Sequence, residues 1–441
     1  MKTLEGIFTV EKLIKLGIIE RPIDGNHGSY HPTSEEYVKE GIPFVMASDL
    51  IDGVIDYKGC KKISKERAER LQKGFSIDGD VLLTHKATIG RTAIVSGNGN
   101  NNYIMLTPQV TYYRIKNPNI LDNRYLKYYF DSLEFQNIFL QWAGGGSTRA
   151  YLGITAQEQL PIKFPDIKTQ RKIISIIDPI NLKIHINNQI NQTLESMAKA
   201  IFKEWFIDFG PVKAKAEGKK PYSMDDETAA LFPDSFEESE LGLIPKGWRV
   251  SCIKKQVDIS RGSSPRPIQE FMGNDLPWFK IADATASNSP YIFKTKEMIK
   301  KEGEKFSVLV EPGDFIVSNS ATCGVPKFVQ LRGCVHDGWL VFKNFKIEQI
   351  FLYHAFVFIA PHLIQIADGS VQKNLNTTLV GEQKIIIPPQ PLIKRFSQTA
   401  EKFFDQILNL EKETNSLTQT RDLLLPKLIS GEIQLKKVDF D

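Results

Sequence analysis

Apolar residues recur at every seventh position over two long segments of the chain, residues 173–201 and 396–424. A heptad repeat of this length is typical of a long helix packed against another helix. We therefore predict long helices over residues 166–209 and 389–430. About forty residues at 1.5 Å each would make each rod about 60 Å long.

Two residues of the first predicted helix depart from the regular pattern. Asn187 occupies a heptad position, where a polar residue can fix the register of paired helices or lie in a partly solvated seam. Pro179 either kinks the helix or, with Asp178 as N-cap, begins a new one. The matching position in the second helix is Lys402, so we expect the two rods to differ in straightness.

The chain contains an internal repeat. Matched residues keep an offset of 234 from position 43 to position 90, and an offset of 223 from position 146 onward. This indicates a tandem duplication in which each globular domain is followed by a long helix. The matched pairs include Pro43 and Pro277, Asp49 and Asp283, Gly79 and Gly313, Gly90 and Gly324, Gly146 and Gly369, and Pro165 and Pro388.

The globular repeats have the pattern of mixed domains. Runs rich in β-branched residues predict strands at 81–84, 109–115, 315–318 and 338–342, and amphipathic runs predict helices at 121–139 and 350–366. We predict an α+β fold with two tandem-repeat globular domains joined by two long antiparallel coiled-coil helices, related by a pseudo-twofold axis. The expected order is domain 1–165, helix 166–209, acidic linker 210–241, domain 242–388, helix 389–430 and tail 431–441.

Composition restricts the class of protein. Of the 441 residues, 41% are hydrophobic, which excludes a disordered chain. We find no run approaching the 18–20 apolar residues that span a bilayer and no secretory signal, so we expect neither a membrane protein nor a secreted one. Four scattered cysteines without a CxxC pair indicate reduced thiols in the cytoplasm and no metal site.

No catalytic motif is convincing. The chain has no GxxxxGK[ST] phosphate loop, no glycine-rich cofactor loop and no Asn/Asp-Pro-Pro-aromatic tetrapeptide of adenine methyltransferases. Residues 165–168 faintly resemble a nuclease core, but the repeat partner 388–391 lacks the acid. Residues 144–149 suit either a phosphate cradle or a flexible turn. We expect no catalytic residue and no cofactor in this chain.

Charge is unevenly distributed. The net charge is +4, but residues 211–240 carry −4, which leaves +8 on the remainder. Residues 58–73 have a net charge of +5 and residues 294–305 of +2, at related places in the two repeats. Such clusters neutralise DNA phosphates, although a solvated helix face has the same composition.

Candidate base-reading residues differ between the repeats while the framework stays. His85 and Lys86 correspond to Asn319 and Ser320, as expected if the domains read different sequences or if the loops have drifted. The asparagine-rich loop at 98–102 is either a further reader or a solvated turn. Our DNA-binding candidates are Lys61, Lys62, Lys65, Arg67, His85, Lys86, Arg91, Arg149, Arg261, Arg266, Lys300, Lys301, Asn319, Lys327 and Lys373.

Three segments carry a resemblance to a known family. They are residues 170–206 (QRKI through NQINQTLE to AIFKEWF), 242–248 (GLIPKGW) and 424–431 (LLPKLISG). With the tandem architecture, they make the chain resemble the specificity subunit of type I restriction-modification systems over nearly its whole length.

The resemblance implies a mechanism. Each globular domain would be a target-recognition domain that reads one half of a split site in double-stranded DNA, and the helices would set the unread gap. Two methyltransferase subunits would dock on the helices and restriction subunits would join them. S-adenosylmethionine, ATP and Mg would then belong to those partners, and this chain would be non-catalytic.

Apolar helix ends are candidates for partner binding: Trp205 and Phe206 on the first helix, and Leu424 and Leu428 on the second. They could equally pack within the chain. Other functions remain open at this stage. They are the recognition subunit of a type IIB-like system, a coiled-coil scaffold that binds only proteins, and an enzyme in its own right.

Overall fold

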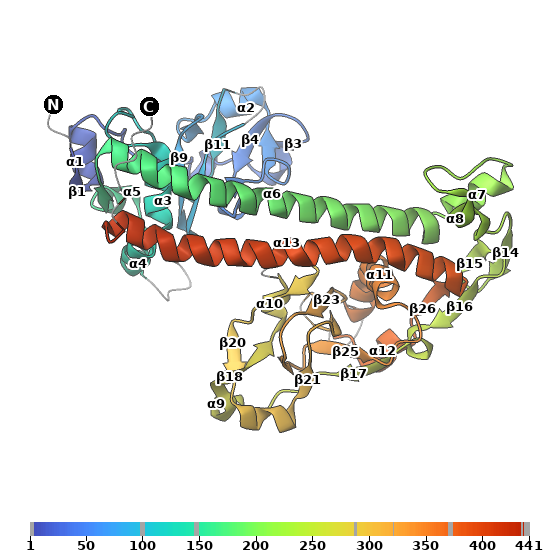
Figure 1. The fold of residues 1–441 in the computed structure, drawn as a ribbon. Helices are drawn as coiled ribbons and strands as arrows, with labels where there is room; N and C mark the ends of the chain where they lie inside the picture. The colour runs from blue at the N-terminus through green and yellow to red at the C-terminus, as the bar shows by residue number, and fades with distance from the viewer. Residues whose placement is uncertain are drawn as a thin grey trace. The chain divides into compact units, whose positions relative to one another are not determined.

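Two helices of about forty residues organise the chain, α6 (Ile167–Phe206) and α13 (Gln390–Ser430) (Figure 1). The computed structural model describes residues 4–97, 102–144, 150–285, 289–320, 322–368, 374–433 and 435. The chain divides into unit 1, residues 1–186 and 413–441, and unit 2, residues 187–412. Each unit therefore contains one globular repeat and part of each long helix.

Within each unit the two helices pack antiparallel. In unit 1, Arg421 Nη1 donates to Asn181 Oδ1 over 3.2 Å. In unit 2, Asn191 Nδ2 donates to Glu411 Oε1 over 3.1 Å. The heptad positions are buried or half-buried, which confirms the predicted helix pair. They are Ile173, Ile180, Asn187, Leu194, Ile201, Phe396, Phe403, Leu410, Leu417 and Leu424.

The start of α6 is fixed by side chains of unit 1. The Asp166 carboxylate accepts from the backbone N–H of Lys168 over 2.9 Å, which caps the helix. Gln170 is fully buried, and its Nε2 donates to the carbonyls of Ile120 and Pro165, 2.8 Å each. This buried amide ties the helix to the globular repeat.

The alternative that a new helix begins at Pro179 is wrong. α6 is continuous through Pro179, because Asp178 does not act as a cap. The Asp178 carboxylate instead accepts from Arg124 Nη1 over 2.9 Å and from the Tyr128 hydroxyl.

The described residues of unit 1 form two larger sheets and two strand pairs. The first has the strand order β10 (Thr88–Ile94), β9 (Val81–Lys86), β12 (Val110–Tyr113) and β2 (Ile23–Asp24). The second has the order β3 (Tyr37–Val38), β7 (Lys61–Ile63), β4 (Ile42–Val45), β11 (Ile104–Leu106) and β8 (Phe75–Ser76). Two small pairs are β1 (Gly6–Thr9) with β13 (Pro161–Phe164), and β5 (Leu50–Ile51) with β6 (Val54–Ile55).

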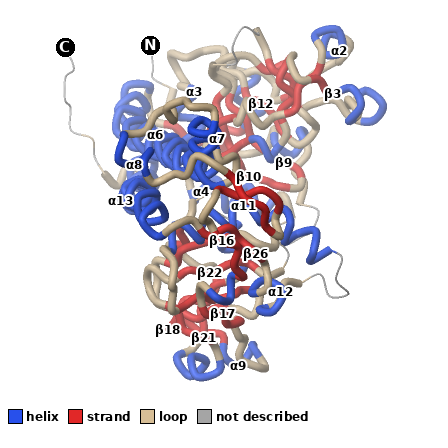
Figure 2. The backbone as a smooth tube through the Cα atoms, turned by 90° about the vertical axis from the view of Figure 1, so that its right-hand side faces the viewer, coloured by secondary structure: helices blue, strands red, loops and turns tan. Residues whose placement is uncertain are grey.

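Unit 2 repeats this arrangement, and its strands lie together in Figure 2. One sheet has the order β17 (Asp258–Arg261), β25 (Trp339–Lys343), β22 (Phe315–Ser318), β23 (Pro326–Val329) and β19 (Tyr291–Ile292). The other has the order β20 (Glu297–Ile299), β18 (Met272–Phe279), β24 (Gly333–Val335) and β21 (Val308–Val310). The small pairs are β16 (Arg249–Cys252) with β26 (Lys384–Ile387), and β14 (Phe236–Ser239) with β15 (Gly242–Pro245).

The shorter helices complete each unit. The helix predicted over 121–139 is in fact two helices, because Ser132 ends α3 and caps α4 with its hydroxyl. Unit 1 holds α1 (Val10–Lys15), α2 (Lys65–Glu69), α3 (Asn123–Asp131), α4 (Leu133–Trp142) and α5 (Ile154–Gln157). Unit 2 holds α7 (Gly210–Ala216), α8 (Asp226–Ala230), α9 (Ile268–Phe271), α10 (Ile281–Thr285), α11 (Gln349–Asp368) and α12 (Thr377–Gly381).

Each unit has a core to which the long helices contribute. In unit 1, Leu425, Leu428 and Ile429 of α13 join Ile173 and Ile177 of α6 and the apolar faces of α3 and α4. In unit 2, the end of α6 and the start of α13 pack on α11 in a core rich in phenylalanine. Deleting either long helix would therefore open both cores.

Helix α11 corrects the expectation about apolar runs. Residues 349–367 have a mean hydropathy of 1.7 and are long enough to cross a bilayer, but half of this segment is buried in the core of unit 2. The apolar composition of α11 is explained by packing.

His354 of α11 is buried in that core. Its ring stacks on Phe202 at 5.6 Å, and its Nδ1–H donates to the Ile350 carbonyl over 2.8 Å. Burial is the main cause that lowers the pKa of His354, to about 4.

This imidazole should make the stability of the chain sensitive to acid. The unfolded chain binds the proton near pH 6.5, before the folded chain does, so stability falls as the pH drops from 6.5 to about 4. We expect a loss of roughly 3 kcal/mol over this range. His354→Phe should remove it in urea titrations, whereas His362→Phe, at an exposed position of α11, should not. Equal pH dependence in all three chains would contradict this assignment.

Candidate nucleic-acid interface

The two repeats place polar residues at equivalent strand ends. Asp24 of β2 pairs with Thr111 of β12, and Arg261 of β17 pairs with Leu340 of β25. β12 and β25 each pair in turn with the central strand of their sheet, β9 or β22, at the equivalent register. Asp24 and Arg261 therefore occupy matching positions with different chemistry.

A glycine follows each of these residues. A Cβ on Gly25 would lie 1.9 Å from the Leu106 carbonyl oxygen, and one on Gly262 would lie 2.2 Å from that of His336. Only glycine allows so close a backbone approach. Both repeats therefore hold the chain at the strand end in the same way.

In unit 1 the strand end carries a cluster around Asp24, which we call the β9 edge (Asp24, His27, Lys73, His85 and Lys86). The Asp24 carboxylate accepts from the Lys73 ammonium and contacts His27 Nε2 at 2.7 Å. His85 Nε2 lies 4.0 Å from the same carboxylate. Four titratable side chains, two of them buried, thus gather at one point.

Electrostatics fix the charge of this cluster. Burial opposes ionisation of Asp24, but hydrogen bonds from Lys73 and His27 outweigh it and lower its pKa. Burial lowers the pKa of His85, against the attraction of Asp24. The β9 edge therefore presents an ionised carboxylate and a neutral imidazole at neutral pH.

In unit 2 the corresponding cluster centres on Asp337; we call it the β22 edge (Arg261, Ser264, Arg266, Asn319 and Asp337). Arg261 Nε donates to the Asp337 carbonyl over 2.9 Å, and Arg266 Nη2 lies 3.5 Å from its carboxylate. Ser264 Oγ donates to Asp337 Oδ1 over 3.1 Å, and Asn319 Nδ2 donates to the Asp337 carbonyl over 3.1 Å. Asp337 thus orients two arginines.

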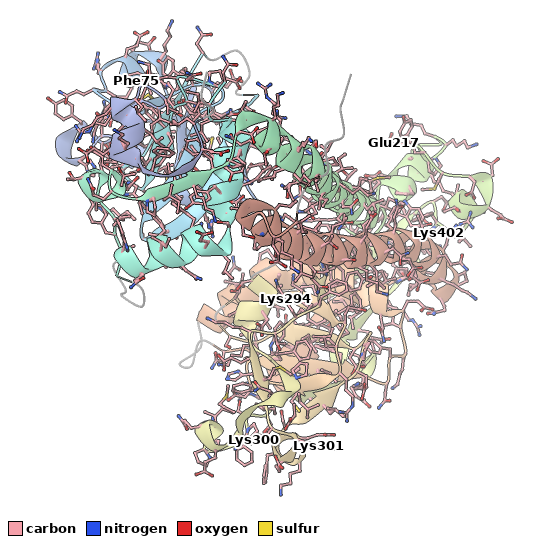
Figure 3. All side chains as sticks on the ribbon, turned by 60° about the vertical axis from the view of Figure 1, so that its left-hand side comes forward. Phe75, Glu217, Lys294, Lys300, Lys301 and Lys402 are labelled. Atoms are coloured by element: carbon pink, nitrogen blue, oxygen red, sulfur yellow. The ribbon has the colours of Figure 1, made fainter. Side chains whose placement is uncertain are left out.

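The predicted basic segments have mixed environments. Lys61 and Lys65 are exposed and Lys62 is half-buried. Arg67 is engaged by the Glu36 carboxylate and the Tyr30 carbonyl, so it is a structural ion pair rather than an available cation. In unit 2, Lys300 and Lys301 lie at the end of the globular repeat away from α13 (Figure 3). Both are exposed.

Other candidates lie on or beside the two edges. Lys86, Arg261 and Arg266 are exposed. Arg91 is exposed as well, but its Nη1 donates to the carbonyls of Ala47 and Leu50. Arg149, Lys373, residues 98–101 of the asparagine-rich loop and residues 145–149 of the glycine-rich stretch lie outside the described residues.

Burial corrects three candidates. His85, Asn319 and Lys327 are 0%, 1% and 5% exposed, so in this structure they cannot reach a base edge directly. His85 and Asn319 lie behind the two edges and support them. The sequence analysis predicted correctly that these two residues lie at the strand ends, but it did not predict that their side chains are buried.

Lys327 has a different role. Its ammonium donates to the Ser289 carbonyl. Burial lowers its pKa, while the charges of Glu195 on α6 and Glu411 on α13 oppose that shift. Burial in turn raises the pKa of Glu195, which also accepts from the Tyr353 hydroxyl over 3.3 Å. Lys327 therefore joins the globular repeat of unit 2 to both helices by buried charge.

The helix ends proposed for partner binding are packed within their own units. Phe206 is 4% exposed, and half-buried Trp205 contacts Phe232 edge-on at 5.4 Å. Leu428 is buried and Leu424 is half-buried in the core of unit 1. Burial corrects Phe206 and Leu428 as docking residues, while half-buried Trp205 and Leu424 pack mainly within the chain.

Sequence reasoning missed the residues that organise the two edges. Asp24, His27 and Asp337 were not among the candidates, and Lys73 was noted only as part of the basic segment 58–73; they come from separate strands and turns. The signal that could have found Asp24 is the pair Gly25 and Gly262. Aligning the repeats on these glycines places Asp24 opposite Arg261.

Comparison with known proteins agrees with this architecture. Residues 22–196 and 245–419 each match the type I restriction modification DNA specificity domain. The chain is 30% identical over 324 residues, 62% of its length and 69% of the relative's, to the specificity subunit of type I restriction enzyme HindI from Haemophilus influenzae. It is 25% identical over 415 residues, 92% of its length and 89% of the relative's, to that of MjaIX from Methanocaldococcus jannaschii.

A solved structure shows the same fold. The crystal structure of a type I restriction-modification S subunit from M. genitalium matches with a TM-score of 0.54 at 13% identity, covering 97% of this chain and 96% of that one. Two repeats of one α+β fold, each followed by a long helix, define a protein with two recognition domains. The chain belongs to the family of type I restriction-modification specificity subunits. The predicted fold class and the interpretation of the chain as a type I specificity subunit are thereby confirmed.

The buried charge of Lys327 leads to a test that separates anchoring from DNA contact. Lys327→Met removes the buried cation that offsets the charges of Glu195 and Glu411, so we expect a loss of about 3–5 kcal/mol in the free energy of unfolding. Lys296→Met, at an exposed position of the same repeat, should change stability little. If Lys327→Met instead weakens DNA binding at unchanged stability, Lys327 belongs to the interface.

Proposed function

We propose that the chain reads a split DNA site, with one half-site for each globular repeat. The supporting observation is the pair of equivalent strand ends, β2 in unit 1 and β17 in unit 2. Their backbones have the same arrangement, but they carry different polar residues. The exposed groups of the β9 edge are His27 and Lys86, beside the buried Asp24 and His85, and those of the β22 edge are Arg261 and Arg266. Side chains that differ in this way recognise different base edges, so two such domains select two different sequences.

The long helices would set the unread gap between the half-sites. Rods of about 60 Å exceed one turn of DNA, roughly 34–36 Å. Exposed Lys61, Lys65, Lys300 and Lys301 would contact phosphates and supply affinity that does not depend on sequence.

We place catalysis in the partners. Two methyltransferase subunits would bind S-adenosylmethionine and restriction subunits would use ATP and Mg, while this chain supplies recognition only. We place the complex in the cytoplasm, which suits the four free thiols Cys60, Cys252, Cys323 and Cys334.

The docking surface for a methyltransferase would lie on the outer face of α6. Leu182 and Ile186 are 59% and 39% exposed and lie one helical turn apart on the same face. Apolar side chains on a solvated helix face are typical of a partner interface. This surface replaces the helix ends, whose apolar side chains are packed within the chain.

Methylation mapping tests the reading function. Cells that express this chain with its cognate methyltransferase should carry methylated adenines in two short fixed blocks around a fixed gap. Cells that express the methyltransferase alone should lack this motif. A stable complex that gives no motif dependent on this chain would contradict the proposal and favour a protein-only scaffold.

The docking surface has its own test. We expect Leu182→Ser with Ile186→Ser to weaken methyltransferase binding at least tenfold in pull-down titrations, because about 1.5–3 kcal/mol of apolar burial is lost per side chain. The thermal midpoint of the free chain should fall only slightly, since Leu182 and Ile186 are already 59% and 39% exposed. Gln192→Ser, at an exposed position of the same helix, is the control. Unchanged binding by the double variant would exclude this face.

A further inference from the structure

We propose that Arg261 is a specificity-determining residue of unit 2 and reads a guanine from the β22 edge, with Asp337 as its positioning residue. This rests on the proposed function of unit 2 as the reader of one half-site. It goes further by naming the base, the side chain and the group that holds it.

The position of Arg261 is set by rigid structure. It is the last residue of β17, paired with Leu340 of β25, and Gly262 then turns the chain against the His336 carbonyl. β17 and β25 are neighbours in Figure 1. A side chain on a paired strand keeps its place better than one on a loop, as base reading requires.

The guanidinium is held from one side only. Arg261 Nε donates to the Asp337 carbonyl over 2.9 Å. Its Nη1 and Nη2 make no hydrogen bond to any part of the chain that the structure describes, and the side chain is exposed. These two nitrogens form the fork that donates to O6 and N7 of guanine in the major groove.

Asp337 makes a phosphate a poor partner for this fork. Its carboxylate lies at the centre of the edge, 2.9 Å from His336 Nε2 and 3.5 Å from Arg266 Nη2. This negative charge offsets that of one arginine and so weakens the attraction of a phosphate, whereas the acceptor edge of guanine is neutral. Asp337 thus orders the arginine and at the same time favours a base over the backbone.

A second observation points into the same place. Asn319 is 1% exposed and donates its Nδ2 to the Asp337 carbonyl, while its Oδ1 has no partner among the described residues. A buried amide oxygen left unpaired is costly, so the edge has unmet polar capacity that a bridging water would satisfy. In unit 1 the position of Arg261 is held by Asp24, which donates nothing. The guanine contact is therefore specific to unit 2.

The test is the methylation motif given by Arg261→Lys in the assembled complex with the cognate methyltransferase. Lysine keeps the positive charge but loses the fork. We expect one G·C position in one half-site to accept other base pairs, and affinity for the original site to fall roughly 5- to 150-fold. The other half-site and the gap should stay unchanged. Arg249→Lys, at an exposed position of β16 in the same unit, is the matched control, and equal thermal midpoints confirm the fold.

Two outcomes would overturn the inference while leaving the proposed function intact. One is an unchanged motif in Arg261→Lys. The other is an equal fall in affinity for all sequences, which would make Arg261 a phosphate contact. If the wild-type chain itself gives no split motif, the proposed function fails, and the two failures are thereby distinguished.

Discussion

The packing of the C-terminal helix into the core of the N-terminal repeat is the interaction on which this architecture depends. Leu425, Leu428 and Ile429 are buried with Ile173 and Ile177, although they are separated from them by the whole of unit 2 in the sequence. The same helix begins in the core of unit 2, where Phe396 meets Phe202 at 5.4 Å. Neither core is complete without both helices, so the folding of each recognition domain depends on both helices.

That constraint explains why the two repeats differ where they do. The residues that close the cores keep their apolar character, because a polar side chain there would be buried without a partner. At the two edges, polar side chains either are exposed, as Arg261 is, or are buried with partners, as Asp24 is with Lys73 and His27. The backbone of the two strand ends is fixed by Gly25 and Gly262, while the side chains differ from Asp24 to Arg261. Rigid framework and variable polar groups are what a recognition module needs.

Anchoring of the repeats to the helices also differs. In unit 1 the contacts include Gln170 and the ion pair of Arg124 with Asp178. In unit 2 the buried Lys327 lies between the charges of Glu195 and Glu411. Ala93 takes the place of Lys327 in the first repeat. Both repeats are therefore anchored to the long helices, but through different polar side chains.

The long helices, the duplication and the main strands could be predicted from the sequence, because periodicity and offset are local or pairwise signals. The break at Ser132 was missed because both sides of it are helical in pattern. The polar clusters were missed for another reason. Asp24 meets Lys73 and His85 only after three segments are brought together, and burial of Asn319 depends on how strands pack. The burial of a side chain is a property of the folded chain and cannot be deduced from an alignment of the two repeats.

The place of the last helix also bears on how the protein is made. Domains usually fold in order as the chain leaves the ribosome, with the N-terminal one first. Here part of the first repeat's core must wait, because Leu425, Leu428 and Ile429 are made only after the whole of unit 2. Until these three residues have been synthesised, Ile173 and Ile177 lack this cover and are available to chaperones or to aggregation. The core of the first domain is therefore completed only after the second domain has been synthesised.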